Sequence, residues 1–188
     1  EGLLPRAACG ALRQALDADG ASAIDSVDGL HEHVLYLDRD HLESVIGPRP
    51  MRTLLELPMR FDELCEERAR DDVRAEVEGS CSHRYRLFDC FLRRYSADAT
   101  SGDQLLTSFH ADSAALTVNV ALTSDAAIEG GRLLGVYDGA VRIIPRREGD
   151  VTVHSSALLH GVTRMHAGTR YSMILFFCRA DAAADPSL

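Results

Sequence analysis

Two histidines and one aspartate stand at a spacing that suits a metal ion. His110 and Asp112 are two residues apart, and His160 follows fifty residues later, at the start of another apolar segment. In an extended chain residues i and i+2 project from the same face, so His110 and Asp112 could contact one ion together. Two histidines and one carboxylate form the facial triad that binds Fe(II) and leaves coordination positions open. The same ligands also suit a hydrolytic zinc site.

An arginine ten residues after His160 indicates what could fill the open positions. Arg170 and Ser172 share one face of a predicted strand. A guanidinium offers paired donors in a fixed fork, which suits a carboxylate, and a buried arginine without an anionic partner would be costly. The open positions on Fe(II) could hold a bidentate 2-oxo acid and dioxygen, while Arg170 binds the remote carboxylate. Hydrolysis at zinc needs no such clamp, so oxidation at iron is favoured.

The segment that must position these residues has the pattern of a mainly β fold. After residue 80 the apolar period changes from the helical value to alternation, and turn signals such as Asp138-Gly139 and Gly149-Asp150 separate short segments. Their spacing predicts a jelly roll with about eight core strands. The expected strands are 84–95, 105–110, 114–123, 131–137, 140–145, 150–155, 159–165 and 169–179.

The first 80 residues predict a helical support region. Apolar residues recur at helical spacing, and Asp40 with Glu43 resembles a capping box. We expect these helices to cover one face of the sheet. The predicted elements are helices over 4–17, 41–46 and around 61–68 and a strand over 33–37. The expected organisation is one domain, with 1–80 as helical support, 81–180 as the jelly-roll catalytic core and 181–188 as a tail.

The charge of the chain is unevenly distributed. The net charge is −9, and residues 1–80 hold nine arginines against eighteen acidic residues, so the remainder is neutral. Without clustered cations, binding to nucleic-acid phosphates is not expected. No apolar run approaches the ~18 residues of a membrane span, so no membrane association is expected. The acidic segment either keeps the molecule soluble or favours a basic substrate.

Three stretches of the β segment resemble a known family. They are His110-Ala-Asp-Ser-Ala-Ala-Leu-Thr-Val-Asn-Val-Ala-Leu122, then Glu129-Gly130-Gly131, and His160-Gly161 through Gly168-Thr169-Arg170-Tyr171. Over about residues 85–179 the chain resembles the Fe(II)/2-oxoglutarate-dependent dioxygenases, specifically the catalytic domains of prolyl and lysyl hydroxylases. The run from Thr117 to Leu122 is most similar to the collagen lysyl hydroxylases.

The resemblance implies a double-stranded β-helix and a role for each site residue. The catalytic metal ligands would be His110, Asp112 and His160. Arg170 would bind the C5 carboxylate of 2-oxoglutarate, with Ser172 as a weaker helper. Two further residues are assigned to cosubstrate contact, each with an alternative: Tyr95, which could instead pack in the core, and Asn119, which could instead be a structural amide.

The resemblance also implies a reaction. Because Asp112 is present where related halogenases have a small residue, hydroxylation of a C–H bond is favoured. Fe(II) would be the cofactor and 2-oxoglutarate and O2 the cosubstrates, with succinate and CO2 as products and ascorbate as an optional reductant. The expected substrate is a peptidyl prolyl or lysyl residue. A free amino acid or small metabolite, and a non-catalytic jelly-roll binding module, are the alternatives. An open groove beside the iron would favour a peptide.

Overall fold

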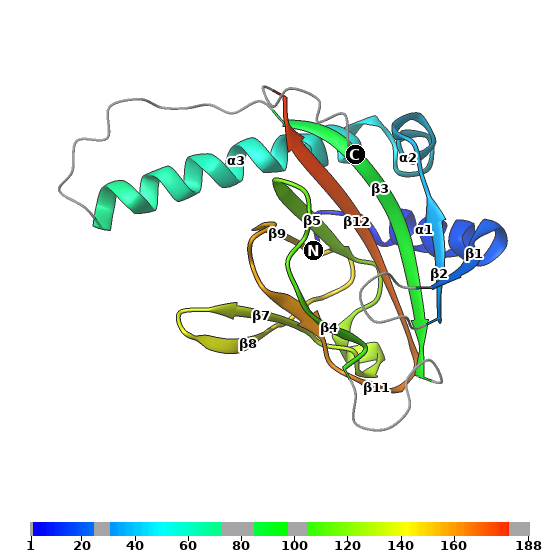
Figure 1. The fold of residues 1–188 in the computed structure, drawn as a ribbon. Helices are drawn as coiled ribbons and strands as arrows, with labels where there is room; N and C mark the ends of the chain where they lie inside the picture. Colours follow the sequence, from blue (N-terminus) through cyan, green and yellow to red (C-terminus); the bar gives the residue numbers. More distant parts are fainter. Residues whose placement is uncertain (1, 25–30, 73–84, 98–104, 181–188) are drawn as a thin grey trace.

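Two antiparallel sheets form the core of the protein in a computed structural model that describes residues 2–24, 31–72, 85–97 and 105–180 (Figure 1). The strands are β1 (Ala21–Ile24), β2 (His31–Tyr36), β3 (Tyr85–Ser96), β4 (Thr107–His110), β5 (Leu116–Ala121), β6 (Glu129–Gly130), β7 (Leu133–Tyr137), β8 (Ala140–Ile144), β9 (Val151–Ser155), β10 (His160–Val162), β11 (Met165–Ala167) and β12 (Thr169–Arg179). The larger sheet has the order β1-β2-β3-β12-β5-β9 and the smaller β4-β10-β7-β8, while β6 pairs with β11.

The predicted jelly roll is confirmed, because every expected strand of the β segment has an observed counterpart. One expected strand, 159–165, is divided. Residues His160–Val162 form β10 in the smaller sheet, and only the last residue of the expected strand, Met165, belongs to β11, which pairs with β6. The backbone amide of Thr163 bonds to the carbonyl of Arg132 where the chain changes partner. The four-residue edge strand β1 and the two-residue strand β6 are too short to show a distinctive alternating pattern, and neither is predicted from the sequence.

Three helices cover one face of the larger sheet, as predicted (Figure 1). They are α1 (Arg6–Asp19), α2 (Arg39–Ile46) and α3 (Pro48–Asp72). Leu12 and Leu16 of α1 and Leu42 of α2 are fully buried in one cluster with the sheet. The predicted capping box is wrong, because Asp38 is the N-cap of α2 and its side chain accepts from the backbone N–H of His41 at 2.7 Å. None of the described helices combines the length and apolarity that a membrane crossing requires.

The long central strands β3 and β12 separate two environments. Leu92 and Leu175 point to the helices and have no exposed surface. The alternate positions, among them Tyr95 and Arg170, point toward the smaller sheet, since successive side chains of a strand take opposite faces. Tyr95 and Arg170 are also register partners across the two strands. The same pair of strands therefore supplies both the helix-covered core and a wall of the interior between the sheets.

We expect Leu175→Ala to lower the free energy of unfolding by about 2–5 kcal/mol, since it leaves a cavity in the main core. The matched control is Leu64→Ala on α3, where the side chain is 59% exposed. It should change the free energy of unfolding by less than about 0.5 kcal/mol. Urea denaturation monitored by circular dichroism measures both. Equal effects of the two substitutions would show that the helices do not bury this face of the sheet.

Candidate active site

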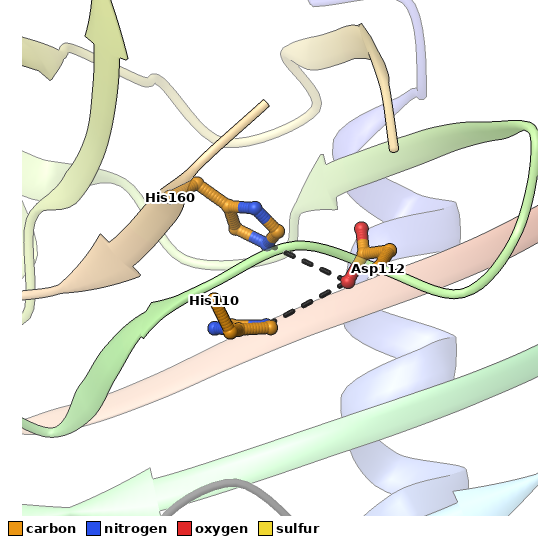
Figure 2. Close-up of side chains that lie close together, drawn as sticks. All are labelled: His110, Asp112 and His160. Atoms are coloured by element: carbon orange, nitrogen blue, oxygen red, sulfur yellow. Dashed lines mark ion pairs between the residues drawn. The ribbon is translucent and has the colours of Figure 1, made fainter. Parts of the chain in front are cut away.

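Strands β4 and β10 bring the two predicted histidine ligands together. His110 ends β4, His160 begins β10, and the two are register partners across the antiparallel pair. Their ring centroids lie 4.3 Å apart. The Oδ1 atom of Asp112 lies 3.6 Å from Nε2 of His110 and 3.8 Å from Nε2 of His160 (Figure 2). All three ligand atoms lie within 4.8 Å of one another, so one metal ion can contact all of them.

Backbone carbonyls orient both rings. The carbonyl of Ser108 lies 2.9 Å from Nδ1 of His110, and the carbonyl of Leu158 lies 3.0 Å from Nδ1 of His160. Each carbonyl accepts from an Nδ1–H group, which leaves the lone pair of Nε2 for a metal, as in other histidine sites. Burial lowers the pKa of His160, which favours the neutral ring that binds metal.

Asp112 is held by residues of the neighbouring strands. It lies beyond the end of β4, and its backbone N–H donates to the carbonyl of Ser156 at 2.9 Å. Thr117 on β5 donates from Oγ1 to Oδ2 of Asp112 at 2.5 Å and lies 3.3 Å from Oγ of Ser156. Because Thr117 engages Oδ2, the other carboxylate oxygen is left for the metal. The expectation that the strand itself orients Asp112 is replaced by this hydrogen-bonded support.

A cavity of about 310 Å³ joins the triad to most of the other predicted residues. Ser172 does not line it but lies on the same face of β12 as Arg170, fully buried. The predicted residues that line the cavity are His110, Asp112, His160, Tyr95, Asn119 and Arg170. The sequence-based candidates are therefore brought to one place, from five different strands and the segment after β4.

Arg170 presents an unsatisfied positive charge to this interior. It is 3% exposed, and its Nε donates to the carbonyl of Gly131 at 3.1 Å. Within the described part of the chain, its Nη2 and the Oγ of Ser172 are buried without a hydrogen-bond partner. Burial, followed by the nearby charge of Arg146, lowers the pKa of Arg170 well below its usual range. A carboxylate would satisfy these donors and offset the charge.

Gly131 helps to place Arg170. Gly130 and Gly131 have φ values of 76° and 63°, the left-handed region that favours glycine. A Cβ at Gly131 would lie 3.1 Å from Met165 and 3.4 Å from Cδ of Arg170. The two glycines permit this backbone conformation where β6 leads toward β7, and there the Gly131 carbonyl accepts from the guanidinium.

Arg146 is a buried cation that is not among the residues predicted from the sequence. It lies between β8 and β9, is 3% exposed, and donates from Nη1 to Oδ1 of Asn119 at 2.9 Å. Because the amide oxygen of Asn119 is engaged, its NH2 group is the free end of the side chain. Arg146 follows Pro145 and precedes Arg147, so the sequence around it resembles an exposed loop and carries no signal of burial.

No family model and no curated protein sequence matches the chain. Solved structures do share its fold. An oxidoreductase of the 2OG-Fe(II) oxygenase family from Burkholderia pseudomallei superposes with a TM-score of 0.53 at 20% identity, over 91% of this chain and 79% of that chain. A prolyl-4-hydroxylase from Pseudomonas putida gives a TM-score of 0.56 at 14% identity, over 95% and 90% of the two chains.

A third neighbour was solved with ligands. HygX from Streptomyces hygroscopicus, with nickel, 2-oxoglutarate and hygromycin B bound, gives a TM-score of 0.57 at 15% identity, over 96% of this chain and 81% of that chain. The fold is therefore that of the 2-oxoglutarate- and Fe(II)-dependent oxygenases, as the sequence predicts. His110, Asp112 and His160 have the composition of the facial triad, two histidines and one carboxylate, that can bind Fe(II).

We expect Thr117→Val to weaken metal binding about tenfold, because it removes the hydroxyl that holds Oδ2 of Asp112. Titration with Ni(II) in competition with a chelator measures the dissociation constant. Thr117→Ser should restore binding, and Thr152→Val on the neighbouring strand β9 is the control with the same chemical change. Metal binding by Thr117→Val as tight as that of the unaltered protein would contradict the assigned support.

Proposed function

We propose that the protein is an Fe(II)/2-oxoglutarate-dependent hydroxylase that acts on a prolyl or lysyl residue of a peptide. The observation that carries the proposal is one cavity that holds both a metal-ligand triad and the unsatisfied guanidinium of Arg170. A zinc hydrolase would use the triad but has no need of a buried cation with free donors. A binding module would need neither feature.

The side chains divide the work of the proposed reaction. Bound Fe(II) with 2-oxoglutarate and O2 supplies the oxidant that hydroxylates a C–H bond, with succinate and CO2 as the other products. The metal would be held by His110, Asp112 and His160. Arg170 would pair with the remote carboxylate of 2-oxoglutarate, and the free Oγ of Ser172 would donate to the same group. The buried residues among its walls would limit the access of bulk water to the reacting groups.

Tyr95 and Asn119 are proposed to complete the cosubstrate site. Tyr95 is 1% exposed, lines the cavity, and is the register partner of Arg170. Asn119 lines the same cavity with its amide oxygen engaged by Arg146, so its NH2 group can donate to a carboxylate oxygen. In this arrangement Arg146 positions Asn119 and adds positive charge near the anion.

A second hollow adjoining the cavity supports a peptide as substrate. It has a volume of about 630 Å³ and shares two lining residues, Tyr36 and Asp89, with the metal-bearing cavity. An extended substrate could therefore place one side chain at the triad while its neighbours cross into the second hollow. The alternative substrate is a free amino acid or other small molecule. HygX, which shares the fold, was solved with the small molecule hygromycin B bound.

We expect Arg170→Ala to raise the 2-oxoglutarate concentration needed for half-maximal turnover at least about tenfold, because hydrogen bonds to a charged group contribute on the order of 1.5–3 kcal/mol. Succinate formation at varied 2-oxoglutarate concentrations measures the effect. Arg142→Ala, which removes an exposed arginine of β8, is the matched control. If Arg170→Ala leaves the 2-oxoglutarate concentration for half-maximal turnover unchanged, another group must bind the remote carboxylate.

The substrate class is tested by a mass-shift screen. The protein, Fe(II), 2-oxoglutarate and O2 are incubated with proline- and lysine-containing peptides and, in parallel, with free amino acids. We expect an iron- and oxygen-dependent gain of one oxygen atom in a peptide, matched by an equal amount of succinate. Modification of free amino acids alone would favour the small-molecule alternative.

A further inference from the structure

Asp89 stands where the two hollows meet. It lies on β3 opposite Phe176 of β12 and lines both the metal-bearing cavity and the second hollow. Directly beyond it the register shifts, since Phe177 pairs with Leu87 and Phe88 is left as the extra residue. Such a bulge re-aims side chains. Leu87 packs with the helix-covered core, while Asp89 faces the cavity.

Three aromatic residues line the metal-bearing cavity together with Asp89. Tyr36 and Phe91 have ring centroids 5.6 Å apart, as do Phe91 and Phe176, and all three residues line the cavity with Asp89. Aromatic faces attract cations through the ring quadrupole. A carboxylate beside several rings is therefore suited to an alkylammonium or guanidinium group that carries apolar carbons.

The arginine beside these aromatic rings is already paired with an acidic residue. Arg93 forms an ion pair with the buried Glu32 at 2.5 Å, and its guanidinium lies 5.2 Å from the centroid of Phe91. Asp89 has no ion pair or hydrogen bond to another of the described residues that the structure records. The negative charge of Asp89 is therefore left to act on whatever enters the mouth of the cavity.

The acidic excess of the first 80 residues does not supply this charge. Among the described residues that line the metal-bearing cavity, Tyr36 alone comes from residues 1–80. The acidic residues of this lining are Asp89 and the proposed metal ligand Asp112. Besides Asp89, the charged residues that line the second hollow are Asp38, Arg39 and Arg86. The two arginines outweigh the charge of Asp38, so we expect a cation to be favoured beside Asp89 more than further along this hollow.

We propose that Asp89, with the aromatic rings beside it, binds a basic side chain next to the target residue of a peptide substrate. This inference rests on the proposed function and adds a preference of the enzyme for the peptide sequence around the target residue. The target residue would occupy the cavity beside the triad, and the neighbouring lysine or arginine would cross the junction between the hollows. Specificity would thus come from one carboxylate in the neutral half of the chain.

The test uses two fluorescent peptides that differ at one position. Each has a central proline, followed by arginine in one peptide and by the uncharged isostere citrulline in the other. Their dissociation constants are measured by anisotropy with the full chain loaded with Ni(II) and 2-oxoglutarate. We expect the arginine peptide to bind about fivefold more tightly, the scale of a partly exposed ion pair.

Variants assign the preference to Asp89. Asp89→Asn should bring the ratio of the two dissociation constants to about one, and Asp89→Glu should restore the preference. Asp138→Asn, which removes an exposed carboxylate in the turn between β7 and β8, is the matched control and should keep it. A ratio of one in the unaltered protein, or a ratio that persists in Asp89→Asn, overturns the inference.

A parallel assay separates this inference from the proposed function. Conversion of 2-oxoglutarate to succinate is followed with Fe(II) in the unaltered protein. Succinate formation with no preference for the arginine peptide would overturn the Asp89 inference alone. An Asp89-dependent preference without iron-dependent succinate formation would overturn the proposed function and leave a cation-binding groove.

Discussion

The interior of this protein is organised around a buried positive charge that the chain does not neutralise. Arg170 is fixed through Nε by the Gly131 carbonyl, yet its Nη2 and the nearby Oγ of Ser172 find no partner among the described residues. A second buried cation, Arg146, lies near enough to lower the pKa of Arg170 further. Unpaired buried charge disfavours the folded state, so an anion that binds there would stabilise it. A dicarboxylate that also reaches the metal satisfies this constraint.

The triad depends on contacts between segments that lie far apart in sequence. His110 and His160 meet only because β4 and β10 pair in one register. Asp112 is oriented by Thr117 from β5 and by the backbone of Ser156, so strands of both sheets contribute to one metal site. The two carbonyls that engage Nδ1 of the histidines each come from a residue two positions earlier in the chain. The types of the ligand residues can thus be read from short sequence motifs, whereas their orientation depends on contacts between distant segments.

Much of this architecture is predictable from the sequence, because alternation and turn residues mark the strands of the β half. The triad and Arg170 stand out because their residue types are unusual in apolar strands. Arg146 is not predictable, since its burial follows from how the β8–β9 connection packs and its neighbours resemble a loop. The role of Asp89 depends on a bulge between β3 and β12, which alternation alone does not show. Helix α2 begins at Arg39 and not at the predicted residue 41. Its N-cap is Asp38, whose extended backbone conformation lets the side chain accept from the N–H of His41.

The central claim is that the triad binds iron for oxidation of 2-oxoglutarate, and one measurement addresses it directly. Succinate is quantified after incubation with 2-oxoglutarate and O2, with and without Fe(II), for the unaltered protein, His110→Ala and the exposed-histidine control His166→Ala. The account predicts iron-dependent succinate formation by the unaltered protein and the control, and none by His110→Ala. Full succinate formation by His110→Ala, or none by the unaltered protein with Fe(II) and O2, would contradict it.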